Sequence, residues 1–360
     1  MHLRRFLPVL LMLAFLALVQ AAVTAAGATY YLTQLTMSGY YVLVVVGLCL
    51  LMGYAGQISL GHAGFFAIGG YTTAVLTTLN LLPHAHTGAV RVLQALWMLS
   101  RRQDLYGNEL LTVSPWAAFL AAMLITAGIA FLVGLPVLRL RGHYLAMATL
   151  GFGLIIYRVV LGTHLFGEAD GIVNVPPFPL LGGMEVTGRL SQRVPNFYIA
   201  WVLVAVVCVL AVNLVNSRVG RALRSIHGSE EAAEALGVNT ARYKLYTFVL
   251  SAVFAAVGGV FLTHFNGGIG PSEATVMKNV RYVAIVAVGG MANLWGVVVM
   301  GLALNFLSLR GMFGTYDDAG FAATLIGIML FAPNGLLRVS VLERLRMAAR
   351  RKAGGARDAR

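Results

Sequence analysis

SRVGRALRSIHGSEEAAEALGVNTARYK, residues 217–244, is the only long segment of mixed charge between strongly apolar runs in this chain. An arginine or lysine at the centre of a bilayer costs roughly 2.5–3.5 kcal/mol, so we expect this segment to lie in water. Its charged residues are Arg218, Arg221, Arg224, Arg242, Lys244, Glu230, Glu231 and Glu234. We therefore expect a strongly apolar protein with one long solvent-exposed segment, in which the flanking apolar runs are membrane spans.

The second half of this segment predicts a short helix. Ser229 suits an N-cap, the acids after it suit the positive end of the helix dipole, and Gly237 suits a left-handed stop. Helical spacing places Ala232, Ala235 and Leu236 on one face and the three glutamates on the other. We therefore interpret residues 229–237 as an amphipathic docking helix. An ordinary solvated loop whose Glu and Ala content favours helix is the alternative.

Composition indicates a polytopic membrane protein. The 360 residues are 59% hydrophobic and 11% charged, with a mean hydropathy of +0.81, whereas a soluble domain has about 25% charged residues. The net charge of +13 falls in loops and in the C-terminal tail, which favours a positive-inside bias over nucleic-acid binding. Cys49 and Cys208 lie inside apolar runs and are expected to be small hydrophobic side chains.

The apolar runs predict an all-α fold of about ten transmembrane helices, some of them broken or short. Both termini and the 217–244 loop are expected to be cytoplasmic, and the 81–114 and 163–195 loops external. Residues 1–337 then form one permease domain and residues 338–360 a basic tail. A cleaved signal peptide is the alternative for the first run, and Val90–Ser100 is a candidate interfacial helix. The expected spans are residues 6–26, 32–53, 57–80, 115–138, 143–162, 196–216, 244–265, 280–292, 293–310 and 320–337.

A second informative stretch is GYAGQISLGHAGFFAIGGY, residues 53–71. Its first residues are expected to break a helix, after which Gln57 and Ser59 offer hydrogen bonds and a helix resumes with small residues that allow close packing. Polar Gln57 and His62 are costly in lipid and should face protein or a cavity. Two interpretations remain open: a substrate-facing broken helix, or a tight turn followed by a packing seam.

Four motifs in order resemble the permeases of branched-chain amino acid ABC importers, in particular the LivM-type subunit. They are residues 53–71, RLRGHYLAMATLGFG at 139–153, the 218–237 segment with Glu231-Ala232-Ala233 and Gly237, and Gly289-Gly290 with Trp295-Gly296. In that family the third motif is a coupling helix seated in a cleft of the ATP-hydrolysing subunit. The resemblance thus implies coupling residues and a candidate pathway: Glu230, Glu231, Ala232, Ala233, Glu234 and Gly237 for coupling, and Gln57, Ser59, His62 and Thr149 for the pathway.

The resemblance also implies partners. These are a homologous second permease of the LivH type, two ATP-binding subunits that hold ATP and Mg²⁺, and a periplasmic or lipoprotein substrate-binding protein, at a bacterial inner membrane. The sequence has no GxxxxGK[ST] loop, so ATP hydrolysis is expected to reside in partner subunits and this chain is expected to bind no cofactor and to be no enzyme. His84 and His86 form only an HxH pair, which we do not interpret as a metal site.

Departures from the family pattern leave the solute open. Leu154 and Tyr157 occupy places where the family often has an acid and a basic residue, and the outer glycine-rich motif is altered to Gly167-Glu168-Ala169-Asp170-Gly171. Branched-chain amino acids are the expected solutes, with urea, short amides or other amino acids as the alternative. A stand-alone secondary transporter or channel is a second alternative, but the apolar runs contain essentially none of the acids that ion coupling needs.

Overall fold

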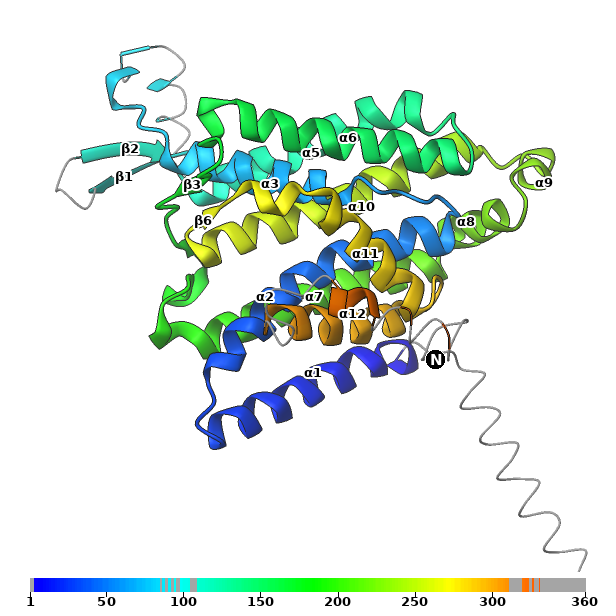
Figure 1. Cartoon of the computed structure of the whole chain (residues 1–360), viewed down its shortest axis with the longest axis horizontal. Coiled ribbons are helices and arrows are strands. Elements are labelled where there is room, and N and C mark those ends of the chain that lie inside the picture. The colour runs from blue at the N-terminus through cyan, green and yellow to red at the C-terminus, as the bar shows by residue number, and fades with distance from the viewer. Residues whose placement is uncertain are drawn as a thin grey trace, which may run out of the picture.

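A computed structural model describes residues 3–84, 86–87, 90–91, 94, 98–103, 109–310, 319–323, 326 and 330 of the 360-residue chain. Within these residues the protein is mostly helical (Figure 1). Six helical segments are long and apolar enough to cross a membrane, which confirms a polytopic membrane protein. They are α1 (Leu3–Ala25), α2 (Tyr30–Leu48) with the π-helical turn Cys49–Tyr54, α5 (Pro115–Val137), α6 (His143–Gly162), α7 (Arg193–Asn216) and α10 (Thr240–Asn266).

Shorter helices that pack within the described bundle include α3 (His62–Thr78), α11 (Val276–Gly289) and the apolar α12 (Leu294–Leu309). The span predicted at 57–80 begins five residues late, because residues 55–61 leave the helical conformation. The two spans expected at 280–292 and 293–310 correspond to two short helices, α11 and α12, which are joined by the turn at residues 290–293. The tenth expected span, 320–337, lies mostly outside the described residues, as does the tail at 338–360.

Helix α2 forms the centre of the bundle, and every residue from Ser38 to Ala55 is buried. Helices α3, α7, α10 and α12 pack around it, while α1 lies at the edge against α7 (Figure 1). The predicted small-residue seam is present between α3 and α10. A Cβ on Gly69 would lie 2.5 Å from the Ala256 carbonyl oxygen, and one on Gly259 would lie 2.0 Å from that of Phe66. These two backbones are therefore in direct contact.

Among the described residues, three small two-stranded sheets are exceptions to the predicted all-α fold, and β1 and β2 form an antiparallel hairpin. In the stretch expected to be an interfacial helix, residues 90, 91 and 94 are helical and strand β1 begins at Leu99; residues 92, 93 and 95–97 lie outside the described residues. The sheets pair β1 (Leu99–Gln103) with β2 (Glu109–Val113), β3 (Ile172–Val173) with β6 (Gly268–Ile269), and β4 (Phe178–Pro179) with β5 (Glu185–Val186).

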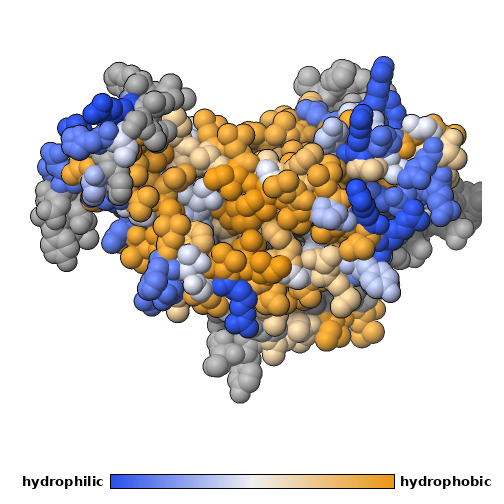
Figure 2. Space-filling model, turned by 90° about the horizontal axis from the view of Figure 1, so that it is seen from above, coloured by the Kyte–Doolittle hydropathy of each residue, from blue (hydrophilic) through white to orange (hydrophobic). Residues whose placement is uncertain are grey.

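The two ends of the bundle separate the loops as the predicted topology does, although Arg101 and Arg102 of the hairpin do not follow the positive-inside pattern. The N-terminus, α8 (Arg218–Gly228) and α9 (Glu230–Ala235) lie at one end, here the α9 end, and the β1–β2 hairpin and β3 lie at the other, the hairpin end (Figure 1). Arg141 contacts Glu230, so the α5–α6 loop is also at the α9 end. Figure 2 shows a continuous apolar band between two polar ends. The bundle therefore has the surface of a membrane-spanning protein.

Candidate functional site

Helix α9 begins and ends where the sequence predicts. The Ser229 hydroxyl accepts a hydrogen bond from the Ala232 amide at 3.3 Å, and Gly237 ends the helical stretch with φ +82°. Helix α8 before it begins with a second serine cap, in which Ser217 accepts from the Val219 amide at 3.1 Å. Both helices have defined starts because capping side chains satisfy their first backbone donors.

The three glutamates of α9 do not share one solvated face, which corrects the expected pattern. Glu230 turns inward and forms an ion pair with Lys244, whose side chain is only 8% exposed. Glu234 accepts a hydrogen bond from the Thr240 hydroxyl at 2.6 Å. Glu231 has 84% of its side chain exposed, and Glu234 is also exposed despite this hydrogen bond. Two of the three acids therefore hold α9 onto the first two turns of α10.

The expected apolar face of α9 is uncovered. Ala232 and Ala235 are exposed, and Leu236 is 81% exposed, while Ala233 is the buried alanine that packs against the bundle. Arg141 approaches from the α5–α6 loop, 3.9 Å from Glu230 and 3.7 Å from Glu231. The helix thus presents a leucine and two alanines outward while its inner side is anchored by charge. This arrangement fits a docking element better than a loop that is solvated throughout.

The second candidate site is the non-helical segment at residues 55–61. The Leu60 amide donates to the Thr149 hydroxyl of α6 at 2.9 Å, and the Ala63 amide donates to the Asn279 side chain of α11 at 2.8 Å. These contacts satisfy two backbone donors at the start of α3, which an apolar surrounding would otherwise leave unpaired. The break between α2 and α3 is therefore held by side chains from two other helices.

His62 connects the same region to α10. Its Nδ1 lies 3.1 Å from the Ser59 hydroxyl, and its Nε2 lies 2.9 Å from the Ser251 hydroxyl. The structure thus brings together three of the predicted pathway residues, Ser59, His62 and Thr149. Gln57 is buried, and neither its side-chain oxygen nor its nitrogen has a hydrogen-bond partner. Sequence reasoning missed Ser251 and Asn279: Ser251 is a polar residue inside an apolar run, and Asn279 precedes the span expected at 280–292.

Helix α8 and the non-helical segment at residues 55–61 are in contact. Gly56 has φ +69°, and a Cβ there would lie 2.9 Å from Nδ1 and 3.4 Å from Cα of His227, near the end of α8. On its other side the segment meets the turn between α11 and α12, where the Tyr54 hydroxyl donates to the Ala292 carbonyl at 2.8 Å. A displacement of α8 would therefore act directly on residues 54–57.

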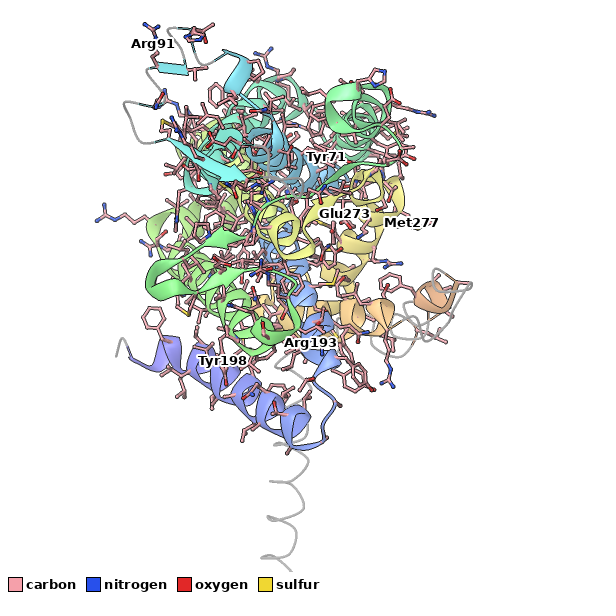
Figure 3. All side chains as sticks on the ribbon, turned by 90° about the vertical axis from the view of Figure 1, so that its left-hand side faces the viewer. Tyr71, Arg91, Arg193, Tyr198, Glu273 and Met277 are labelled. Atoms are coloured by element: carbon pink, nitrogen blue, oxygen red, sulfur yellow. The ribbon has the colours of Figure 1, made fainter. Side chains whose placement is uncertain are left out.

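A charged cluster that sequence reasoning missed lies near the middle of the bundle. Glu273, in the 3-10 turn Pro271–Ala274 (η6), pairs with Lys278 of α11 at 2.9 Å. The Tyr41 hydroxyl of α2 donates to Glu273 at 3.0 Å and also lies 3.0 Å from the Lys278 ammonium. Figure 3 shows Glu273 from the hairpin end, close to Tyr71 and Met277. Residues 266–279 were expected to be a loop outside the spans. The search for acidic residues within the spans therefore overlooked this pair.

The bundle has apolar spans, a helix break in its core and a polar helix exposed at one end. This combination defines a polytopic membrane permease. Residues 30–333 match the family described as the permease component of the branched-chain amino acid transport system. The chain belongs to this family: it is the permease component of an ABC transporter and not a catalytic subunit.

Curated relatives agree with this assignment. The chain is 30% identical to the high-affinity branched-chain amino acid transport system permease protein LivM of Escherichia coli K12, over 84% of this chain and 68% of that protein. It is 26% identical to LivH of the same organism, over 86% of this chain and 96% of LivH. A nucleoside ABC transporter permease protein, NupC of Lactococcus lactis, is 29% identical over 44% of this chain and 51% of its own length. No solved structure matches the chain.

Proposed function

We propose that this protein is the LivM-type permease subunit of an importer that moves leucine, isoleucine and valine across a bacterial inner membrane. Partner ATP-binding subunits supply the energy, with the α9 end in the cytoplasm and the hairpin end facing a substrate-binding protein. The observation that carries the proposal is α9 itself: a capped helix anchored by two acids, with Leu236 and Glu231 projecting outward. Similarity to both LivM and LivH supports a pair of homologous permease subunits.

The contacts suggest how force reaches the pathway. An ATP-binding subunit that grips the exposed side of α9 would move α9 and α8 together, because the two helices join at Ser229. Helix α8 touches Gly56 through His227, so the movement reaches the segment at 55–61. That segment carries Ser59 and precedes His62, both bonded within the bundle. We infer that rearrangement of these bonds accompanies alternating access.

The coupling role predicts that Leu236→Asp weakens docking of the ATP-binding subunit by about tenfold or more, because a charge replaces an exposed apolar contact without touching the bundle. Co-purification of the subunits from membranes measures this. Leu190→Asp is the matched control, since Leu190 is 72% exposed and lies at the opposite end. Equal recovery of ATP-binding subunit with both variants would contradict the assignment.

Two further variants separate docking from coupling. Glu231→Lys reverses an acid of α9 whose side chain is 84% exposed, and Gly237→Pro removes the left-handed stop. We expect the ATP-binding subunits to hydrolyse ATP in complexes that contain either variant. Substrate uptake by these complexes should be lost, and membrane insertion of the variants should be unchanged. Wild-type uptake by these variants would refute force transmission through residues 229–237.

Import of a different solute is the second candidate function. The family includes a nucleoside permease, and Leu154 and Tyr157 depart from the usual pattern. Selection is expected to occur largely at the substrate-binding protein. Binding assays on the cognate binding protein with leucine, a nucleoside, urea and short amides therefore discriminate between these solutes: tight leucine binding supports the first proposal, and its absence supports the second.

A further inference from the structure

The ion pair between Glu273 and Lys278 lies deep in the protein. Tyr41, which contacts both groups, is near the middle of the 25-residue span Tyr30–Tyr54. Lys278 also lies over the Tyr41 ring, 4.4 Å from its centroid. The pair is not sealed, because the Glu273 and Lys278 side chains remain 14% and 22% exposed. Charged groups at such depth are costly, and in membrane proteins they generally mark a solute pathway.

Polar groups around the pair have unused hydrogen-bonding capacity. The hydroxyls of Tyr71 and Tyr282 are both buried, and neither has a partner. Helix α3, which carries Tyr71, packs against η6, and the Tyr282 ring centroid lies 6.2 Å from that of Tyr41. A buried hydroxyl without a partner is destabilising, because it has lost its hydrogen bonds to water. An ion pair that served only to hold η6 against α2 would not need them.

A small cavity of about 30 Å³ adjoins the cluster. Tyr41, Lys278 and Tyr282 line it, together with Arg281, Asn305, Ser308 and Leu309. Space of this size holds a water molecule but not an amino acid. The site is therefore closed in this conformation, although the Glu273 and Lys278 side chains are partly exposed and Met277, which precedes Lys278 in the chain, lies on the surface. Opening toward that surface would expose both charges together.

We propose that Glu273 and Lys278 form the head-group site for a zwitterionic amino acid during translocation. The Lys278 ammonium binds the α-carboxylate, the Glu273 carboxylate binds the α-ammonium, and the Tyr282 and Tyr71 hydroxyls supply additional hydrogen bonds. The Glu273–Lys278 pair re-forms after the solute leaves, so no charge is left unpaired in the resting state. This inference rests on the proposed function, because it assumes an amino-acid solute.

The test uses the complete importer in lipid vesicles, with its binding protein and radiolabelled leucine at saturating concentration. Glu273→Gln and Lys278→Met each remove one charged contact, and we expect uptake to fall about tenfold or more while ATP hydrolysis in the assembled complex continues. Tyr282→Phe removes only a hydroxyl without a partner. It should leave thermal stability equal or higher and lower uptake about threefold or more.

Tyr40→Phe is the matched control, since the Tyr40 hydroxyl is also buried without a partner but Tyr40 does not line the cavity. Lower uptake by Tyr282→Phe than by Tyr40→Phe, with intact complex, supports the head-group site. Equal uptake by these two variants overturns it and leaves the ion pair a structural contact, even if the Glu273 and Lys278 variants fail to assemble. Absence of leucine uptake by the wild-type importer would instead refute the proposed function.

Discussion

Gly53 lies where two distant parts of the backbone meet. A Cβ on this residue would lie 1.4 Å from the Met291 carbonyl oxygen and 3.1 Å from Cα of Ala292. The neighbouring Tyr54 hydroxyl donates to the Ala292 carbonyl at 2.8 Å, across 238 positions of sequence. The sequence predicted a helix break at this glycine. The physical requirement is a different one: the turn between α11 and α12 needs the space that a side chain would fill.

Gly53→Ala should therefore destabilise the protein by about 3 kcal/mol, because one backbone must move to relieve the overlap. Fluorescence-detected size-exclusion chromatography after heating would measure the change. Gly151→Ala is the control, since its Cβ would have no neighbour within 4 Å on helix α6 and alanine favours helix. Identical melting of the two variants would contradict the packing seen at Gly53.

The break between α2 and α3 is an element with no regular hydrogen-bond ladder of its own. Thr149 of α6 and Asn279 of α11 accept hydrogen bonds from its amides, so the element depends on two helices that follow it in sequence. Regular helices such as α5 and α7 satisfy their backbone internally and follow from apolar length alone. The broken segment does not, and its conformation depends on the assembled bundle.

Thr149→Val keeps the shape of the side chain but leaves the Leu60 amide unpaired. We expect it to cost about 1–3 kcal/mol and to reduce uptake. Thr126→Val is the isosteric control, because the Thr126 hydroxyl on α5 is fully buried and already has no partner. The thermal midpoint of the assembled complex reports the difference. If both valine variants melt at the wild-type temperature, Thr149 does not hold the broken segment.

At the scale of the whole molecule, the two ends differ in structure. The α9 end carries the proposed docking helix, where Arg141 and Lys244 both contact Glu230, whereas the hairpin end carries the small sheets (Figure 1). The sequence contains no GxxxxGK[ST] loop, so the energy for transport is expected to enter through α9 from a separate subunit.

The purified chain alone in lipid vesicles should consequently show no nucleotide-dependent accumulation of leucine, whereas the chain assembled with its ATP-binding subunits and second permease should accumulate it in the presence of ATP. Radiolabelled uptake into vesicles loaded with and without ATP measures both. Concentrative uptake by the chain alone would favour the stand-alone transporter and would refute the coupling mechanism.

The sequence alone determined the membrane class, most of the apolar helices, the relative sides of the main loops and the limits of α9. These features depend on local composition, capping and charge, which act over a few residues. Only the tertiary structure decided that Glu230 faces inward, that Ser251 and Asn279 bond to the start of α3, and that Glu273 and Lys278 meet Tyr41. Such contacts join residues far apart in the chain, and periodicity within one segment carries no information about which distant group will lie opposite it.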